Sequence, residues 1–245
     1  PNLALNYSTF AVPNDPRFTD QWHLRNTGQS GGTVGADANI EGAWDNYTGQ
    51  GVTIGIIDDG LQIDHEDLVA NVRTDIDFDW IGNDNDPSPG STNFHGTAVA
   101  GISAAKGDNG IGVTGAAYNA ELVGLRLIGG PITDRDIAEA LTINPDVIDV
   151  YNNSWGPDIV SGIAPLGPQS TAALQQAATT GRGGLGRIHV FAAGNDGARE
   201  DDVNYNQLAN SRFTIAVAAL LDTGSRASYS NPGAPVLVSA YADPV

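Results

Sequence analysis

Ten residues, from Gly51 to Gly60, constrain the fold of this chain more than any other stretch. They form an almost unbroken apolar and β-branched run that stops at two carboxylates and a glycine. A strand that is apolar on both faces is typical of the centre of a parallel sheet covered by helices on both sides. In such sheets the chemistry lies beyond the carboxyl ends of the strands. The pattern therefore places Asp58 and Asp59 where a site is expected, although Asp58-Asp59-Gly60 also fits a polar turn that only closes a strand.

Composition narrows the class of protein and its partners. The chain has 245 residues, enough to bury a full core without disulfides or metals. Its 29 acidic and 11 basic residues give a net charge of −18, which argues against nucleic acid or an anionic membrane as a partner. The charge is consistent with cationic substrates, bound divalent cations or solubility alone. The chain has no cysteine for disulfides or thiol chemistry, and no stretch approaches the roughly 20 apolar residues of a membrane span.

The order of apolar and polar stretches predicts one doubly wound α/β domain over residues 39–245, with a mostly parallel sheet and helices on both faces. Residues 1–38 are polar and punctuated by glycine and proline, so we expect an extended arm packed on the domain and anchored by Trp22 and Leu24. Helices are expected at 40–46, 94–105, 133–143 and 169–180. Strands other than the central one are expected at 122–127, 147–151, 188–191, 214–217 and 236–240.

One motif must be rejected. Residues 181–186 read Gly-Arg-Gly-Gly-Leu-Gly, which fits the dinucleotide fingerprint G-x-G-x-x-G. That motif works only after a strand and at the start of a helix, where helix N–H groups hold the pyrophosphate. Here it follows an expected helix and precedes an expected strand. We therefore exclude a nucleotide-binding oxidoreductase.

Three residues at strand ends or helix starts form a candidate catalytic set. Asp58 ends the central strand, His95 opens a helix, and Asn195 lies in a glycine-flanked turn after a third strand. An aspartate meeting a histidine over the sheet would keep one imidazole nitrogen protonated and leave the other free to take a proton from a hydroxyl. The Asn195 amide could donate to a developing oxyanion. A lone histidine is more often structural, so the set carries the argument and no single residue does.

Acidic side chains crowd the loop after the central strand. A solvated surface is the usual explanation of such a run. Here the acids alternate with Asn, Gly and Pro, which favours loops that bind Ca²⁺ through oxygen ligands. The acids are Asp64, Glu66, Asp67, Asp75, Asp77, Asp79, Asp84 and Asp86.

Several short motifs follow one another along essentially the whole chain. They are Asn14 to Phe18 with Gln21-Trp22, Ile57 to Gly60, His65 to Leu68, His95-Gly96-Thr97 with Ala100-Gly101, Asn153 to Pro157, Gly181 to Gly186, and Ala193-Gly194-Asn195. In this combination the chain resembles the subtilisin-type serine proteases, or subtilases, and among them the kexin/furin-like branch. The resemblance implies a subtilisin-like fold, Asp58 and His95 as two members of a catalytic triad, and Asn195 as the oxyanion donor.

The resemblance also implies how a protein or peptide substrate is bound. Ser154, Trp155 and Gly156 would pair as a strand with the substrate, and Asp59 would line the subsite for the penultimate residue. Two departures concern the primary pocket: Asp158 stands where the branch has a longer acidic run, and Asn206 stands where it has an acid. We expect Arg or Lys to be favoured before the cut, less strictly than in the family's most selective members.

Calcium is the one cofactor that the resemblance implies. One site would take side chains of Asp15, Asp67 and Asn109 and backbone carbonyls of Lys106, Ile111 and Val113. A second would take Asp79, Asp84 and Asp86. A third keeps Asp201 but has Asn231 where the branch carries an acid.

The family's nucleophile lies in a Gly-Thr-Ser motif, and no serine of this chain has that context. The chain also begins at Pro1 and contains no methionine. We therefore interpret it as the larger part of a catalytic domain from a processed, secreted or periplasmic precursor, inactive alone, whose partners include a cleaved propeptide and the missing C-terminal fragment. The alternative is a non-catalytic calcium-binding pseudoprotease module.

Overall fold

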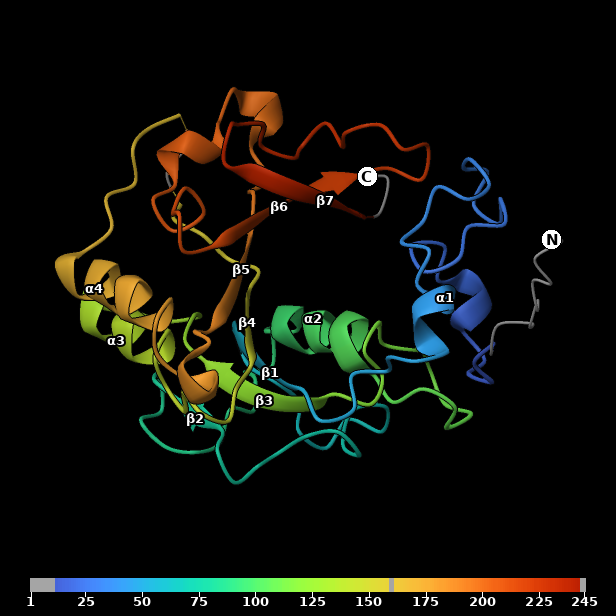
Figure 1. The fold of residues 1–245 in the computed structure, drawn as a ribbon, viewed down its shortest axis with the longest axis horizontal. Helices are drawn as coiled ribbons and strands as arrows, with labels where there is room; N and C mark the ends of the chain where they lie inside the picture. Colours follow the sequence, from blue (N-terminus) through green and yellow to red (C-terminus); the bar gives the residue numbers. More distant parts are fainter. Residues whose placement is uncertain (1–11, 159–160, 243–245) are drawn as a thin grey trace, which may run out of the picture.

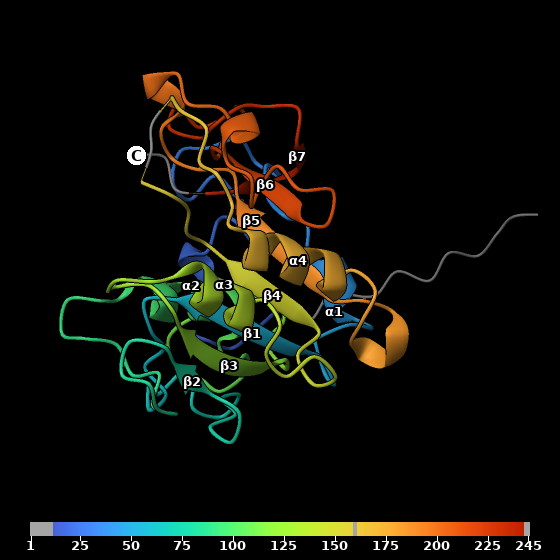
Figure 2. The ribbon, with the colours of Figure 1, turned by 90° about the vertical axis from the view of Figure 1, so that its left-hand side faces the viewer.

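Strand β1 (Thr53–Asp58) is buried along its whole length and lies inside a parallel sheet. The computed structural model describes residues 12–158 and 161–242, and within them the sheet has seven strands in the order β2-β3-β1-β4-β5-β6-β7. Figure 2 shows the strands climbing in that order from β2 to β7. The other strands are β2 (Phe78–Asp79), β3 (Glu121–Arg126), β4 (Val150–Asn153), β5 (Ile188–Ala192), β6 (Ile215–Leu220) and β7 (Val236–Tyr241).

Helices cover both faces of this sheet, which confirms the predicted doubly wound α/β class (Figures 1 and 2). The α-helices in the described part of the chain are α1 (Glu41–Trp44), α2 (His95–Ala104), α3 (Asp134–Ala140) and α4 (Pro168–Ala177). Alternate side chains of β1 pack against the helices on opposite faces of the sheet. Ile57 belongs to the apolar cluster that includes residues of α3 and α4, whereas Ile54 and Ile56 belong to the cluster that includes Ala100 and Ala104 of α2.

Several predicted boundaries were displaced. The strand predicted at 147–151 is observed as β4, which begins three residues later, at Val150. Val147 and Ile148 are still held in a turn, because their backbone N–H groups donate to the carbonyl of Asn144. The predicted capping box at Thr133 is present, with its partner Asp136, but the helix ends at Ala140. Strand β2 has two residues and was not predicted.

The glycine run at 181–186 joins α4 to β5, as the rejection of a nucleotide site requires. Gly181, Gly183, Gly184 and Gly186 all have positive φ, a conformation that favours glycine. A Cβ added at Gly186 would lie 2.4 Å from the carbonyl oxygen of Ala178. The glycines therefore permit a tight turn from helix to strand.

The described part of the N-terminal arm, residues 12–38, packs through aromatic side chains. Phe18 and Leu24 are buried in a small cluster with Trp44. Trp22 is also buried and meets Tyr241 edge-on, with ring centroids 6.1 Å apart. Both predicted anchors are therefore buried. Residues 1–11 lie outside the described residues, and the boundary at residue 38 stays a prediction.

Candidate active site

The end of β1 and the start of α2 bring a carboxylate and an imidazole together. Asp58 is fully buried, and its Oδ1 lies 2.8 Å from Nδ1 of His95. Because a carboxylate accepts, this contact selects the tautomer in which Nδ1 carries the proton. The His95 side chain is 56% exposed, so the rest of the ring is open to a reacting group. The predicted meeting of Asp58 and His95 is observed.

Gly96 and Asp59 allow the start of α2 to lie this close to the end of β1. A Cβ added at Gly96 would lie 2.2 Å from the carbonyl oxygen of Gly60 and 2.8 Å from Cβ of Asp58, so only glycine fits here. Asp59 then accepts hydrogen bonds from the backbone N–H groups of His95 (3.3 Å) and Gly96 (2.8 Å). Phe94, the residue at the helix N-cap, makes no side-chain cap. Asp59 therefore caps α2 from the end of the neighbouring strand.

This arrangement changes the acidity of His95. The hydrogen bond to Asp58 raises the pKa of His95 above its ordinary value of 6.5, and the charges of Asp58 and Asp59 act in the same direction. Partial burial of the ring opposes them. The net rise indicates that the site stabilises the imidazolium that forms when His95 accepts a proton.

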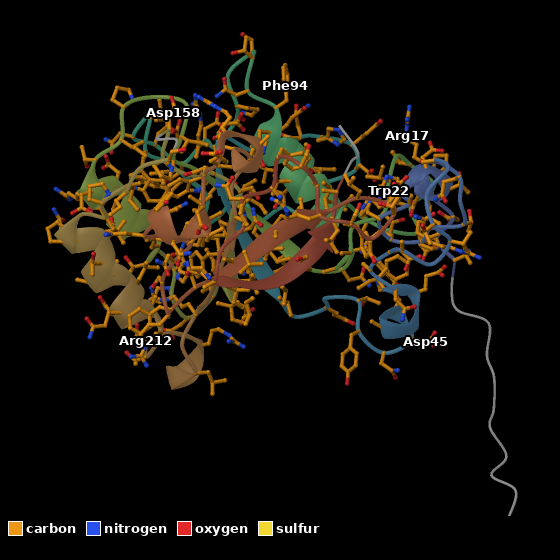
Figure 3. All side chains as sticks on the ribbon, turned by 90° about the horizontal axis from the view of Figure 1, so that it is seen from above. Arg17, Trp22, Asp45, Phe94, Asp158 and Arg212 are labelled. Atoms are coloured by element: carbon orange, nitrogen blue, oxygen red, sulfur yellow. The ribbon has the colours of Figure 1, made fainter. Side chains whose placement is uncertain are left out.

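Asn195 lies beyond β5 in the same region as the segment that follows β4. It is exposed and lines a cavity of about 240 Å³ together with the predicted substrate residues Ser154, Trp155 and Gly156. Figure 3 shows Phe94, at the start of α2, and Asp158, beside this cavity, on one edge of the molecule, opposite Asp45 and Arg212. The carboxyl ends of the strands thus carry the cavity and the Asp58–His95 pair along one edge.

The two predicted primary-pocket residues differ in what they offer. Asp158 is exposed and makes no ion pair with any described residue. Asn206 uses its Oδ1 to accept from the backbone N–H groups of Leu208 (3.0 Å) and Ala209 (3.4 Å). Its Nδ2 therefore faces the opposite wall, 3.3 Å from where a Cβ of Gly156 would stand. The cavity thus has a carboxylate at Asp158 and an amide donor at Asn206.

The residues of the first predicted calcium site converge on one loop. Asp15 and Asp67 are buried, and both are bonded to Asn109: its backbone N–H donates to Asp15 (3.1 Å) and its Nδ2 donates to Asp67 (3.0 Å). No Lys or Arg side chain is paired with either carboxylate among the described residues, so hydrogen bonds alone hold them: Asp15 also accepts from the Thr114 hydroxyl (2.6 Å), and Asp67 from the backbone N–H of Val113 (2.8 Å). A cation between the two would offset their mutual repulsion.

Backbone carbonyls of the same loop add further oxygen atoms beside these carboxylates. Within the described residues, the carbonyl oxygens of Lys106, Ile111 and Val113, three half-buried residues, accept no backbone hydrogen bond, so they remain open to a ligand role. Ca²⁺ prefers six to eight oxygen ligands of these types. The carboxylates and carbonyls therefore fit the ion that the sequence predicts, whereas the Asn109 side chain turns its Nδ2 toward Asp67 and uses its Oδ1 to accept from the backbone N–H of Ile111 (2.7 Å).

The second and third predicted sites fit less well. Asp79 and Asp84 face each other across Gly82, but Asp79 is already paired with Arg126 at 2.9 Å. Asp201 accepts a 2.7 Å hydrogen bond from the side chain of Asn231. Asp86 is exposed and bonded to the backbone N–H of Ser88. In the described part of the chain, no three acidic or histidine side chains gather closely enough to hold a metal.

Sequence reasoning missed two roles in this region. It did not foresee that Arg126, the last residue of β3, neutralises Asp79; the only signal was an arginine at a strand end. It also assigned Asp59 to the substrate alone, and not to the cap of α2. A carboxylate just before the helix region was the available signal.

Comparison with known proteins identifies the class. The Subtilase family model matches residues 49–243, so this chain belongs to the subtilase family. It is 42% identical over 235 residues to the PC3-like endoprotease variant B of Hydra vulgaris and 41% identical over 239 residues to neuroendocrine convertase 2 of Rattus norvegicus. These matches confirm the predicted kexin-like resemblance. They cover 94% of this chain but 33% and 37% of those proteins, so the chain spans about a third of the relatives' length.

Solved structures agree with this assignment. A serine protease of Aeromonas sobria, crystallised with its chaperone, matches with a TM-score of 0.84 at 29% identity, over 94% of this chain and 43% of that one. A protease of Pseudoalteromonas arctica matches with a TM-score of 0.75 at 32% identity, over 94% of this chain and 72% of that one. Within the described residues, no helix has the length and apolar character needed to cross a membrane.

Proposed function

We propose that the complete protein to which this chain belongs is a serine endopeptidase that works through an acyl-enzyme. The observation that carries the proposal is the 2.8 Å contact between Asp58 and His95 at the edge that also carries Asn195. Asp58 fixes the ring with Nδ1 protonated, which leaves Nε2 as the general base. Nε2 takes the proton from a serine hydroxyl as its oxygen attacks the substrate carbonyl. The Asn195 amide donates to the resulting oxyanion, and His95 then returns the proton to the departing amine.

The nucleophilic serine of this mechanism is proposed to lie outside residues 1–245. Two features of the described surface support a further segment packing on it. An open groove of about 980 Å³ runs along α2 and is lined by Phe94 and Ile102, which are 69% and 56% exposed. On β7, Leu237 and Val238 are 68% and 50% exposed. Apolar faces of this kind are unusual unless something covers them.

The proposed substrate is a peptide segment bound in extended form along Ser154, Trp155 and Gly156. Arg or Lys is proposed to be favoured before the cut, because Asp158, which pairs with no cation among the described residues, brings a carboxylate to the cavity, and because Asp59 is proposed to line the next subsite. A partly desolvated ion pair with a basic side chain discriminates against neutral ones. The preference is proposed to be moderate, since Asn206 adds no charge.

Calcium is proposed as a structural ion that supports this activity. Bound by Asp15, Asp67, Asn109 and the three loop carbonyls, it would supply positive charge between the buried carboxylates and fasten the arm to the loop after α2. Secretion or export to the periplasm, and a propeptide removed on maturation, are proposed from the family resemblance.

The decisive experiment uses the complete gene product. It should cleave peptides, lose activity to serine-directed phosphonylating reagents, and lose several orders of magnitude of kcat in a folded His95→Ala variant. Unchanged activity in that variant would overturn the proposal. The rival function, a calcium-binding pseudoprotease, gains support only if the reading frame beyond Val245 encodes no Gly-Thr-Ser motif and the folded product fails to label.

A further inference from the structure

The turn that carries Asn195 is held by a residue from a distant segment. Asn231 is 3% exposed and follows β6 in the chain. Its backbone N–H donates to the carbonyl of Gly194 (3.1 Å), and its Oδ1 accepts from the backbone N–H of Asp196 (2.8 Å). One residue therefore holds the chain immediately before and immediately after Asn195.

The third polar atom of Asn231 anchors this contact to the primary-pocket wall. Its Nδ2 donates to Asp201 Oδ2 (2.7 Å), and Asp201 Oδ1 in turn accepts from the backbone N–H of Ser161 (3.0 Å). The packing leaves no slack, because a Cβ at Gly194, where φ is +106°, would lie 2.4 Å from that Nδ2. All polar atoms of the Asn231 side chain are therefore committed to the turn and its surroundings.

Asn231 is itself fixed from the sheet. The hydroxyl of the preceding residue, Ser230, is buried and accepts from the backbone N–H of Ala219 in β6 (2.9 Å). Gly197, just past the turn, donates to the carbonyl of Tyr229 (2.8 Å). The turn thus rests on a strand of the core through residues 229–231.

We propose that Asn231 is a positioning residue that keeps the Asn195 amide aimed at the oxyanion, through hydrogen bonds on both sides of Asn195. The inference rests on the proposed protease function. It also explains why Asp201 and Asn231 do not fit a calcium site. A calcium site here would have a carboxylate at each position and the cation between them, whereas the Asn231 amide donates a hydrogen bond directly to Asp201. An oxyanion donor is effective only when its position is fixed before the charge develops.

The test compares single, double and exchanged variants of the complete protein. Asn195→Ala should lower kcat about 10²–10³-fold, and Asn231→Ala should lower kcat about tenfold or more with KM nearly unchanged. Because Asn231 acts through Asn195, Asn195→Ala/Asn231→Ala should be no slower than Asn195→Ala alone. Multiplying effects in the double variant would overturn the proposal.

An exchange of the two side chains supplies the rescue. Asn231→Asp loses the donor to Asp201 and places two carboxylates together, so kcat should fall. Asp201→Asn/Asn231→Asp restores a donor and an acceptor at the same contact, so kcat should recover most of the loss. Failure of the exchange to improve on Asn231→Asp alone counts against the proposal.

A matched control separates positioning from stability. Asn26 is also 3% exposed, and its amide also ties a turn by donating to Ala36 and Asp222 and accepting from Gly28. Asn26→Ala should lower the melting temperature as Asn231→Ala does, yet leave kcat unchanged. Equal losses of kcat in both variants would reduce Asn231 to a structural residue.

A protein that cleaves no peptide would refute the proposed function but not the positioning role of Asn231. Hydrogen exchange tests that role without any activity. In Asn231→Ala the backbone N–H of Asp196 should lose its protection, while it stays protected in Asn26→Ala. Retained protection of Asp196 in Asn231→Ala would overturn the positioning role, whatever the activity.

Discussion

Asp59 caps the helix that carries His95: its Oδ1 accepts a 2.8 Å hydrogen bond from the backbone N–H of Gly96, while its Oδ2 accepts from His95 itself. The consecutive residues Asp58 and Asp59 therefore have different roles. Asp58 orients the imidazole ring, and Asp59 fixes the backbone from which the ring projects. A negative charge at a helix N-terminus is also favoured by the helix dipole.

Removal of this cap should affect both stability and acidity. We expect Asp59→Ala to lower the free energy of unfolding by about 1 kcal/mol, as for other lost caps. It should also lower the pKa of His95, since the Asp59 charge contributes to raising it. Thermal melting and an NMR titration of the ring measure the two effects. Asp64→Ala, an exposed acid of the following loop, is the charge-matched control; a His95 pKa that moves equally in both variants would refute the local role.

The pH dependence of activity should follow His95. The base must be neutral to accept a proton, so kcat/KM should rise with pH through the raised pKa, that is, above the ordinary value of 6.5. Asp58→Asn removes the main cause of the rise and should shift the acid limb to lower pH while strongly reducing kcat. For stability the sign is opposite: the raised pKa contributes stability that is complete below pH 6.5 and is lost as pH rises through the folded-state pKa. An acid limb that stays in place in Asp58→Asn would contradict the assignment.

Calcium should stabilise the fold through the loop at 106–113. Binding to the folded state alone raises stability with ion concentration, by about 2.7 kcal/mol at one hundred times Kd. We therefore expect chelator to lower the melting temperature of the wild type, and Asp67→Asn to melt low and respond little to calcium. Asp64→Asn, at an exposed position three residues before Asp67, should behave as the wild type. Refolding in chelator removes slowly exchanging ion, so an unchanged melting curve after that treatment would count against the site.

Patterns within one segment were the ones that the sequence could predict. The run of apolar residues in β1 predicted a doubly covered central strand, and the motif at His95 predicted the start of α2. Pairing between distant segments was not encoded locally. Ile148 is apolar because it packs in the core, whereas Val147 is exposed, and the hydropathy of the pair placed a strand three residues before β4 begins at Val150.

The same limit explains the errors at the site. Arg126 meets Asp79 across 47 residues of sequence, and Asn231 meets Asp196 across 35. Such pairs depend on how strands order in the sheet, and a single sequence carries no periodicity that marks them. Family motifs predicted the residues at the reacting edge, whereas the supporting contacts became visible only with the fold.

A buried histidine in β5 should make the fold sensitive to acid. His189 is 1% exposed and stacks on Tyr151, with ring centroids 4.7 Å apart. Burial, helped by the charge of Arg187, lowers the pKa of His189 to about 4. The unfolded chain therefore binds a proton more readily, and stability should fall as pH drops from about 6.5 to 4, by about 3 kcal/mol at most. His189→Leu should flatten this slope in thermal melts, and an unaltered slope would rule out the histidine as its source.

The choice of the residue before the cut should respond to single charges at the cavity. In Asn206 the Oδ1 is taken by the backbone N–H groups of Leu208 and Ala209, which leaves an amide donor toward the cavity. Asn206→Asp keeps an acceptor for those N–H groups and turns a carboxylate oxygen to the pocket. The variant should therefore raise the ratio of kcat/KM for Arg or Lys over neutral residues by tenfold or more, the order expected for a charge-assisted hydrogen bond of about 1.5–3 kcal/mol.

The opposite change tests Asp158, one of the acids that line the cavity. Asp158→Asn should lower the preference for Arg and Lys, by less than Asn206→Asp raises it, because Asp158 is exposed and its charge is screened by solvent. Cleavage profiles of the complete protein on a random peptide library measure both shifts. Asp202→Asn, close in sequence but outside the cavity lining, is the control for net charge. A wild-type preference for large apolar residues, unchanged by either substitution, would show that shape and not charge selects the substrate.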